Sequence, residues 1–136
     1  MVRMDPNPDQ EPDFGAPQLE TSLTGIFTFE ASHQLEWHSG KCSRLHGHSY
    51  QLSVTVTGPV NGDGIVIDFA VLKAAVQAHV LDDYDHAHLN DLLSNPTAEL
   101  IAADAATRLL AAGLPVSEVT IRETAKYSST VRIARR

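Results

Sequence analysis

Cysteine is almost absent from this sequence: Cys42 is the one thiol among 136 residues. A single thiol excludes an internal disulfide framework and suits a reducing cytoplasm. Long apolar runs are absent as well, so no segment reaches the length that a membrane-spanning helix needs. The first eight residues contain no apolar core of the kind that a signal peptide carries. From these absences we expect a cytoplasmic protein without a membrane partner.

Basic residues are also scarce, with 10 Lys and Arg against 17 Asp and Glu and a formal net charge of −7 at pH 7. That balance disfavours a surface that follows the phosphates of a nucleic acid. An anionic small molecule would have to be held by a local cluster of basic side chains. The length suits one domain, and an apolar content of 43% is enough for a modest core.

Proline is concentrated at the N-terminal end of the chain. Residues 1–21 contain four of the seven prolines, several acidic residues and few apolar ones. Such a segment cannot bury enough apolar surface to order itself. The sequence therefore predicts a disordered tail over residues 1–21 and one folded domain over residues 22–136.

The folded part alternates between strand and helix patterns. Apolar residues recur at every second position in four segments, which is typical of strands. These segments are residues 23–33, 46–57, 116–124 and 130–133. One helix is predicted from an Asp68 cap to near Asp82, and another from Pro96 and Thr97 to just before Gly113. This order predicts an α+β fold, a four-stranded antiparallel sheet with two helices on one face, whose open edges favour a homo-oligomer.

Three histidines lie in the first two predicted strands. His46 and His48 share the apolar face of the second strand, because side chains alternate along a strand. His33 ends the first strand on its apolar face, from where it can approach His48 across the sheet. Imidazole is a common zinc ligand, and three protein ligands leave a fourth position open for a substrate. Polar residues at fraying strand ends are the alternative, but three converging imidazoles favour a catalytic zinc centre.

Cys42 lies four residues before His46, with Lys41 and Arg44 close to it. Basic neighbours and a nearby metal ion both favour the thiolate, which indicates a base or a nucleophile. Two alternatives remain open from the spacing. The thiol can be buried and inert, or it can be the fourth ligand of a closed structural zinc site.

Two further positions carry carboxylates of interest. Asp85 precedes His86 in the connector between the helices, where it can orient the imidazole, although a solvated loop explains the pair as well. Glu123 falls on the apolar face of its predicted strand, where a carboxylate must find donors or carry a raised pKa. A ligand with adjacent N–H groups would satisfy it; the alternative is an exposed residue at the strand's end.

Six ordered segments resemble the 6-pyruvoyl-tetrahydropterin synthase family. They are residues 27–33, 41–50, 64–69, 85–90, 96–99 and 122–124. The resemblance implies the tunnelling fold, in which small sheets associate into a barrel as a trimer and two trimers stack into a hexamer. His33, His46 and His48 match the zinc ligands of the family, and Cys42 matches its catalytic proton acceptor.

The same resemblance implies roles for residues outside the histidine cluster. Asp85 and His86 match residues that handle protons together with the cysteine. Glu123 matches the acid that anchors the pterin ring and is often counted in the proton relay. Thr97 and Glu99 belong to a segment that borders the pterin pocket.

The spacing between Cys42 and His46 indicates the branch of the family. Three residues separate them, as in the members that form 6-carboxytetrahydropterin, whereas the pyruvoyl-forming members have a longer gap. The similarity implies a zinc-dependent lyase that converts 7,8-dihydroneopterin triphosphate to 6-carboxy-5,6,7,8-tetrahydropterin in queuosine biosynthesis, with release of acetaldehyde and triphosphate. The alternatives are a 6-pyruvoyl-tetrahydropterin synthase or a related pterin aldolase. A non-catalytic zinc-binding module with Cys42 as fourth ligand is the alternative outside enzymes.

Overall fold

The computed structural model describes residues 19–134, so most of the predicted tail lies outside the described residues. Two strands of 13 residues, β1 (Thr21–His33) and β2 (His46–Gly58), form the centre of the fold. They pair antiparallel from Thr21 opposite Gly58 to His33 opposite His46. The sheet thus begins one residue before the predicted domain boundary.

Within the described residues the sheet contains five strands in the order β3-β1-β2-β4-β5. β4 (Val116–Arg122) and β5 (Ser128–Arg132) continue it antiparallel beyond β2. The two-residue strand β3 (Ala87–His88) pairs in parallel with Ala31 and Ser32 of β1. The predicted α+β class with helices on one face is confirmed, but the parallel fifth strand was not predicted. Two residues are too few to show an alternating pattern.

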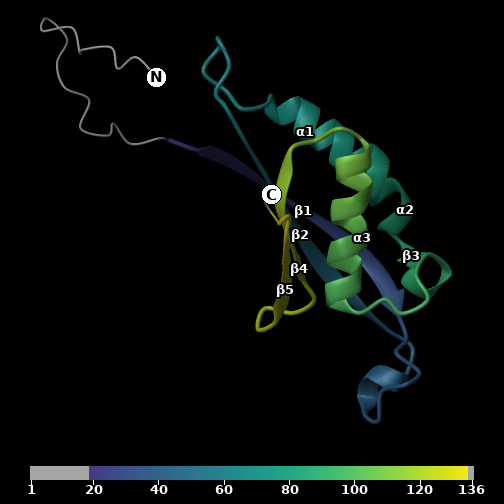
Figure 1. Ribbon diagram of the computed structural model, residues 1–136. Coiled ribbons are helices and arrows are strands. Elements are labelled where there is room, and N and C mark those ends of the chain that lie inside the picture. Colours follow the sequence, from purple (N-terminus) through teal and green to yellow (C-terminus); the bar gives the residue numbers. More distant parts are fainter. Residues whose placement is uncertain (1–18, 135–136) are drawn as a thin grey trace, which may run out of the picture.

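The helices follow β2 in the chain and cover one face of the sheet (Figure 1). The first helical segment consists of α1 (Phe69–Val76), a π-helical turn η2 (Gln77–Leu81) and α2 (Asp82–Tyr84). The Asp68 side chain caps α1 by accepting the backbone N–H of Ala70 at 2.7 Å, as predicted. None of the helices among the described residues has the length and apolar character that crossing a bilayer requires.

The longest helix, α3 (Ala98–Ala111), also has the predicted ends. Thr97 caps it by accepting the backbone N–H of Leu100 at 3.2 Å. Gly113 follows it with φ +90°, the left-handed conformation that commonly ends helices. Two short 3₁₀ turns complete the fold: η1 (Lys41–Ser43) in the β1–β2 loop and η3 (Leu89–Asp91) after β3.

The core lies between the sheet and the helices. Alternate residues of β2 from Tyr50 to Val56 have no exposed surface, as the period-two pattern predicts. The residues that complete the core come from α1, α3 and the neighbouring strand β4: Leu72, Val76, Ile101, Ala105, Leu109, Val119 and Ile121. His46 and His48 continue the same face of β2 toward its start. The core therefore ends in imidazoles where β1 ends and β2 begins.

A polar network fixes α2 to α3. Arg108 donates from Nε to Asp104 Oδ2 at 2.9 Å and from Nη1 to Asp83 Oδ2 at 2.5 Å. The Tyr84 hydroxyl also donates to Asp104 Oδ2. Because Asp83 and Tyr84 directly precede Asp85, this network fixes the start of the connector that carries a predicted site residue.

Candidate active site

The structure brings the three predicted histidines together at one end of the sheet. His33 lies opposite His46, and His48 lies two residues farther along β2. The ring centroids are 4.4 Å apart for His33 and His46, 5.1 Å for His33 and His48, and 4.9 Å for His46 and His48. One nitrogen from each ring lies within 4.8 Å of the other two. The predicted approach of His33 to His48 therefore occurs, although the direct cross-strand partner of His33 is His46.

Backbone carbonyls set which ring nitrogens are free. His33 Nδ1 lies 2.8 Å from the Pro96 carbonyl oxygen, and His46 Nδ1 lies 2.7 Å from that of Arg44. A carbonyl oxygen only accepts, so both Nδ1 atoms carry hydrogen and both Nε2 atoms of the neutral rings offer a lone pair. These two Nε2 atoms are 2.8 Å apart. Two lone pairs so close need a proton or a cation between them.

His48 adds the third nitrogen. Its Nε2 is buried and has no hydrogen-bond partner among the described residues. Burial lowers the pKa of His48, and the neighbouring His33 and His46 lower it further, so the ring is favoured in its neutral, metal-binding form. A buried orphan nitrogen is explained when an ion binds it. The three imidazoles can therefore hold a metal ion, and their nitrogens suit zinc and other divalent ions that prefer imidazole.

Glu123 lies beside this cluster. β4 ends at Arg122, so Glu123 stands just past the strand, with Oε1 3.9 Å from His33 Nε2 and Oε2 3.8 Å from His48 Nε2. The pKa of this carboxyl is raised, mainly by burial and also by Glu99, although His33 and His46 oppose the shift. The carboxylate is thus held in a poorly solvated place, where N–H donors of a ligand would stabilise its charge.

Tyr50 is a neighbour of the cluster, on the same buried face of β2 as His46 and His48. It has no exposed surface, and its hydroxyl has no partner among the described residues. Its ring stacks on Phe29 at 4.8 Å and lies 5.2 Å from the His48 ring. Burial, and then the charge of Glu123, raise the pKa of Tyr50, so the hydroxyl stays protonated. The shared parity with His46 and His48 was the available signal.

Thr97 and Glu99 stand at the start of α3. The Thr97 side chain is used as the helix cap, which gives it a structural task independent of any ligand. Glu99 Oε1 accepts a hydrogen bond from Ser129 Oγ at 2.8 Å, which links α3 to β5. Glu99 is also close enough to affect the pKa of Glu123. These positions border the histidine cluster, and neither is part of it.

Cys42 lies in the η1 turn, half-buried, with its carbonyl accepting the backbone N–H of Leu35 at 2.9 Å. Across the described range, the metal-ligand group consists of His33, His46 and His48, and the thiol is not in it. The geometry therefore gives no support to the alternative in which Cys42 completes a four-ligand structural site.

Asp85 and His86 form a pair beside β1. Asp85 Oδ1 lies 3.0 Å from His86 Nδ1 and accepts the backbone N–H of Glu30 at 2.9 Å. These interactions lower the pKa of Asp85, the Glu30 N–H most and His86 next. The His86 side chain is 78% exposed. In Figure 1 the loop between β1 and β2, which contains η1, projects beyond the ends of these two strands. Cys42 is not among the residues that line the groove beside His86.

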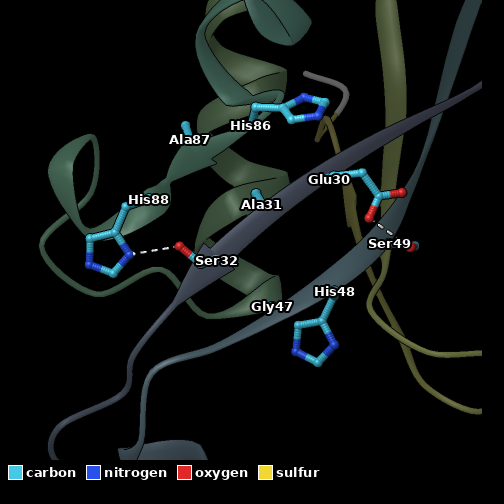
Figure 2. Close-up of a pocket in the computed structure, with 9 residues that line it drawn as sticks. All are labelled: Glu30, Ala31, Ser32, Gly47, His48, Ser49, His86, Ala87 and His88. Atoms are coloured by element: carbon cyan, nitrogen blue, oxygen red, sulfur yellow. Dashed lines mark hydrogen bonds between the residues drawn. The ribbon is translucent and has the colours of Figure 1, made fainter.

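A groove of about 600 Å³ is lined by residues 86–88, by residues 30–32 of β1 and by residues 47–49 of β2. Figure 2 shows His86 and His88 on the β3 side of the groove and His48 on the β2 side, with Glu30 between them. Glu30 accepts a hydrogen bond from Ser49 Oγ at 2.7 Å. The groove thus offers imidazole and carboxylate groups to a ligand or to a segment of another chain.

Comparisons with known proteins give a consistent answer. The 6-pyruvoyl tetrahydropterin synthase family model matches residues 22–134. The 6-carboxy-5,6,7,8-tetrahydropterin synthase of Synechocystis sp. is 45% identical over 106 residues, which are 72% of this chain and 82% of that protein. The dihydroneopterin monophosphate aldolase of Pyrococcus furiosus is 40% identical over 78 residues, which are 55% of this chain and 62% of that protein.

The fold is also similar to solved structures. The 6-pyruvoyl tetrahydropterin synthase of Caenorhabditis elegans matches with a TM-score of 0.76 and 27% identity, over 85% of this chain and 97% of that one. The family match covers nearly all of the described residues, from the first strand to the last. This chain therefore belongs to the 6-pyruvoyl tetrahydropterin synthase family.

Proposed function

We propose that this chain converts 7,8-dihydroneopterin triphosphate to 6-carboxy-5,6,7,8-tetrahydropterin, a step of queuosine biosynthesis. One water is consumed, and acetaldehyde and triphosphate are released, which balances the atoms. The observation that carries the proposal is the convergence of three imidazoles, in which the Nε2 atoms of His33 and His46 lie 2.8 Å apart. It is supported by the 45% identity to a relative named for this product.

We assign the metal to His33, His46 and His48 and infer that it is zinc. The donor set supports this assignment, since three converging imidazoles, two of them held at Nδ1 by backbone carbonyls, are typical of a catalytic zinc shell. When bound, zinc supplies a Lewis acid that polarises side-chain oxygens of the substrate. The carbonyls of Pro96 and Arg44 keep the two rings in the ligating tautomer.

Glu123 binds the pterin ring in this proposal. The adjacent N–H groups of the aminopyrimidine can donate to both carboxylate oxygens, which offsets the burial that raises the pKa of Glu123. Glu99 and Thr97 stand beside this pocket at the start of α3. The fixed ring orients the substrate side chain toward the histidine cluster.

Cys42 accepts a proton from the substrate side chain, with His86 as its proton-transfer partner. Asp85 orients the His86 ring through the 3.0 Å contact at Nδ1. Cys42 and His86 lie apart within one chain, so we infer that they act together in a homo-oligomer of the tunnelling type, a trimer or a hexamer. Open strand edges support such association.

A second candidate reaction has support from one relative. The Pyrococcus furiosus protein that is 40% identical is named a dihydroneopterin monophosphate aldolase, so a related chemistry on a similar pterin is the competing proposal. A 6-pyruvoyl-tetrahydropterin product is the other competitor within the family. The three reactions release different side products, which makes them easy to distinguish.

The test is incubation of zinc-loaded protein with 7,8-dihydroneopterin triphosphate, followed by mass identification of the pterin and an assay for acetaldehyde. We expect 6-carboxytetrahydropterin and acetaldehyde in equal amounts. A pyruvoyl product, or phosphorylated glycolaldehyde from an aldolase reaction, would replace the proposal by its competitor. Cys42→Ala should lose activity but keep its zinc; sulfur in the first shell of the metal by X-ray absorption would contradict the role of Cys42.

A further inference from the structure

His86 has an unusual backbone. Its φ is +61°, the left-handed region that residues other than glycine rarely adopt. Such a conformation persists only where the surrounding structure over-determines it. The His86 backbone N–H donates to the Glu30 carbonyl of β1 at 2.5 Å, and Asp85 Oδ1 accepts the Glu30 N–H at 2.9 Å. These two bonds hold His86 from its N-terminal side.

Side chains extend the short strand β3 on its C-terminal side. The regular pairing of β3 with β1 covers two residues, Ala31 with Ala87 and Ser32 with His88. Ser32 Oγ and His88 Nδ1 are hydrogen bonded at 3.0 Å. A pairing of two residues is too short to hold the segment by itself, so the side-chain bonds contribute much of the attachment.

Asn90 makes the strongest of these attachments. Its Oδ1 accepts the backbone N–H of Gln34 at 2.8 Å, and its Nδ2 donates to the Gln34 carbonyl at 2.8 Å. One amide side chain thus satisfies both backbone groups of Gln34, as a neighbouring strand would. Gln34 directly follows His33, so the same contact also fixes the end of β1 that carries a histidine of the cluster.

We propose that Asn90 is a positioning residue, which holds the Asp85–Asn90 segment in register on β1 and thereby keeps His86 in its left-handed conformation. The Ser32–His88 bond assists it. The inference rests on the proposed function for the catalytic consequence, since His86 is there the proton-transfer partner of Cys42. The structural part stands independently, because it concerns the attachment of the segment to β1.

The test compares Asn90→Ala with Asn61→Ala as a matched control. Asn61 Oδ1 also accepts two backbone N–H groups, those of Asp63 and Ile65, in a turn outside the groove. The first readout is amide hydrogen exchange at the His86 N–H. We expect it to become about tenfold faster in Asn90→Ala and to stay within about twofold in the control. Ser32→Ala, which breaks the weaker bond, should speed exchange by about two- to threefold.

The second readout is the kinetics of the proposed reaction. In Asn90→Ala we expect kcat to fall about tenfold with KM and zinc content nearly unchanged, because His33 is still held by its pairing with His46 and by the Pro96 carbonyl. If His86 exchanges at the wild-type rate in a folded Asn90→Ala protein, the inference is overturned. Faster exchange with unchanged kcat would overturn its catalytic consequence. If the protein does not act on the pterin, the exchange experiment still decides the attachment. If Asn90→Ala does not fold, Asn90→Asp, which keeps the Oδ1 acceptor and loses the Nδ2 donor, replaces it in the exchange experiment.

Discussion

Tyr50 and Tyr84 are both fully buried, but only one of the two hydroxyls has a partner among the described residues. The Tyr84 hydroxyl donates to Asp104, whereas that of Tyr50 meets none. A buried unpaired hydroxyl destabilises the folded state, so Tyr50→Phe should raise the free energy of unfolding by about 1 kcal/mol. Tyr84→Phe leaves Asp104 without this donor and should lower it by about 1–2 kcal/mol.

Urea unfolding followed by fluorescence or circular dichroism would measure both variants. The two substitutions are chemically identical and equally buried, so each is the control for the other. A Tyr50→Phe protein that unfolds at lower urea than the wild type would mean that the hydroxyl has a partner, such as a buried water.

The three imidazoles also lead to a prediction about metal removal. Without a cation, the His33 and His46 lone pairs face one another at 2.8 Å, so the metal-free protein should be less stable. Free zinc at 100 times its dissociation constant should stabilise the fold by about 2.7 kcal/mol. Thermal melts with chelator and with added zinc would measure the difference. His46→Ala should abolish it, and His79→Ala, outside the cluster, should keep it; a zinc effect that survives in His46→Ala would contradict the assignment.

At the scale of the elements, Arg108 fastens α2 to α3. It bonds Asp104 and Asp83 with about a quarter of its side chain exposed, and its guanidinium stands 5.3 Å from the centre of the Tyr84 ring. Arg108→Met keeps most of the apolar stem but breaks the network, so unfolding should require about 1–3 kcal/mol less free energy. Arg132→Met is the control, because its pair with Glu118 is largely exposed and should contribute at most about 0.5 kcal/mol. Equal losses in the two variants, measured in urea, would show that the network adds nothing beyond a surface ion pair.

Elements encoded by local sequence patterns could be predicted, whereas an element held by contacts between residues far apart in the chain could not. β1, β2 and the caps at Asp68 and Thr97 are encoded by local patterns, and the structure has them where those patterns predict. β3 is different, because it is held by side-chain bonds to β1 across some 55 residues of chain, and no local pattern reports such pairing.

In the candidate site, too, some features could be predicted from local patterns and others could not. The histidine cluster was predictable because parity and strand pairing bring its three members together. The proximity of Glu123 to His33 and His48 depends on the pairing of β4 with β2 and on where β4 ends, which spacing along the chain does not give. The orphan Tyr50 hydroxyl could not be foreseen either, since a parity pattern places a side chain but does not report its partners.

At the scale of the whole molecule, the proposed reaction requires Cys42 and the Asp85–His86 pair to act at one site. β5 is an open edge of the sheet, and among the described residues β1 is paired on its outer side only at Ala31 and Ser32. Two open edges allow copies to associate side by side, and in the proposed oligomer the η1 turn of one copy meets the groove of the next. The proposed site is then shared between subunits.

Shared sites predict a specific result when two inactive variants are combined. Cys42→Ala and His86→Ala should each be inactive alone. When they are co-expressed with different tags and purified as hybrids, random assembly leaves both wild-type residues at about a third of the sites of a trimer and about a quarter of those of a hexamer, so the same share of the activity should return. Co-expression of two differently tagged Cys42→Ala chains is the control and should stay inactive. If the hybrids remain as inactive as the parents, both residues act from the same chain, and the single-chain separation of Cys42 and His86 would have to close by a movement of the η1 loop.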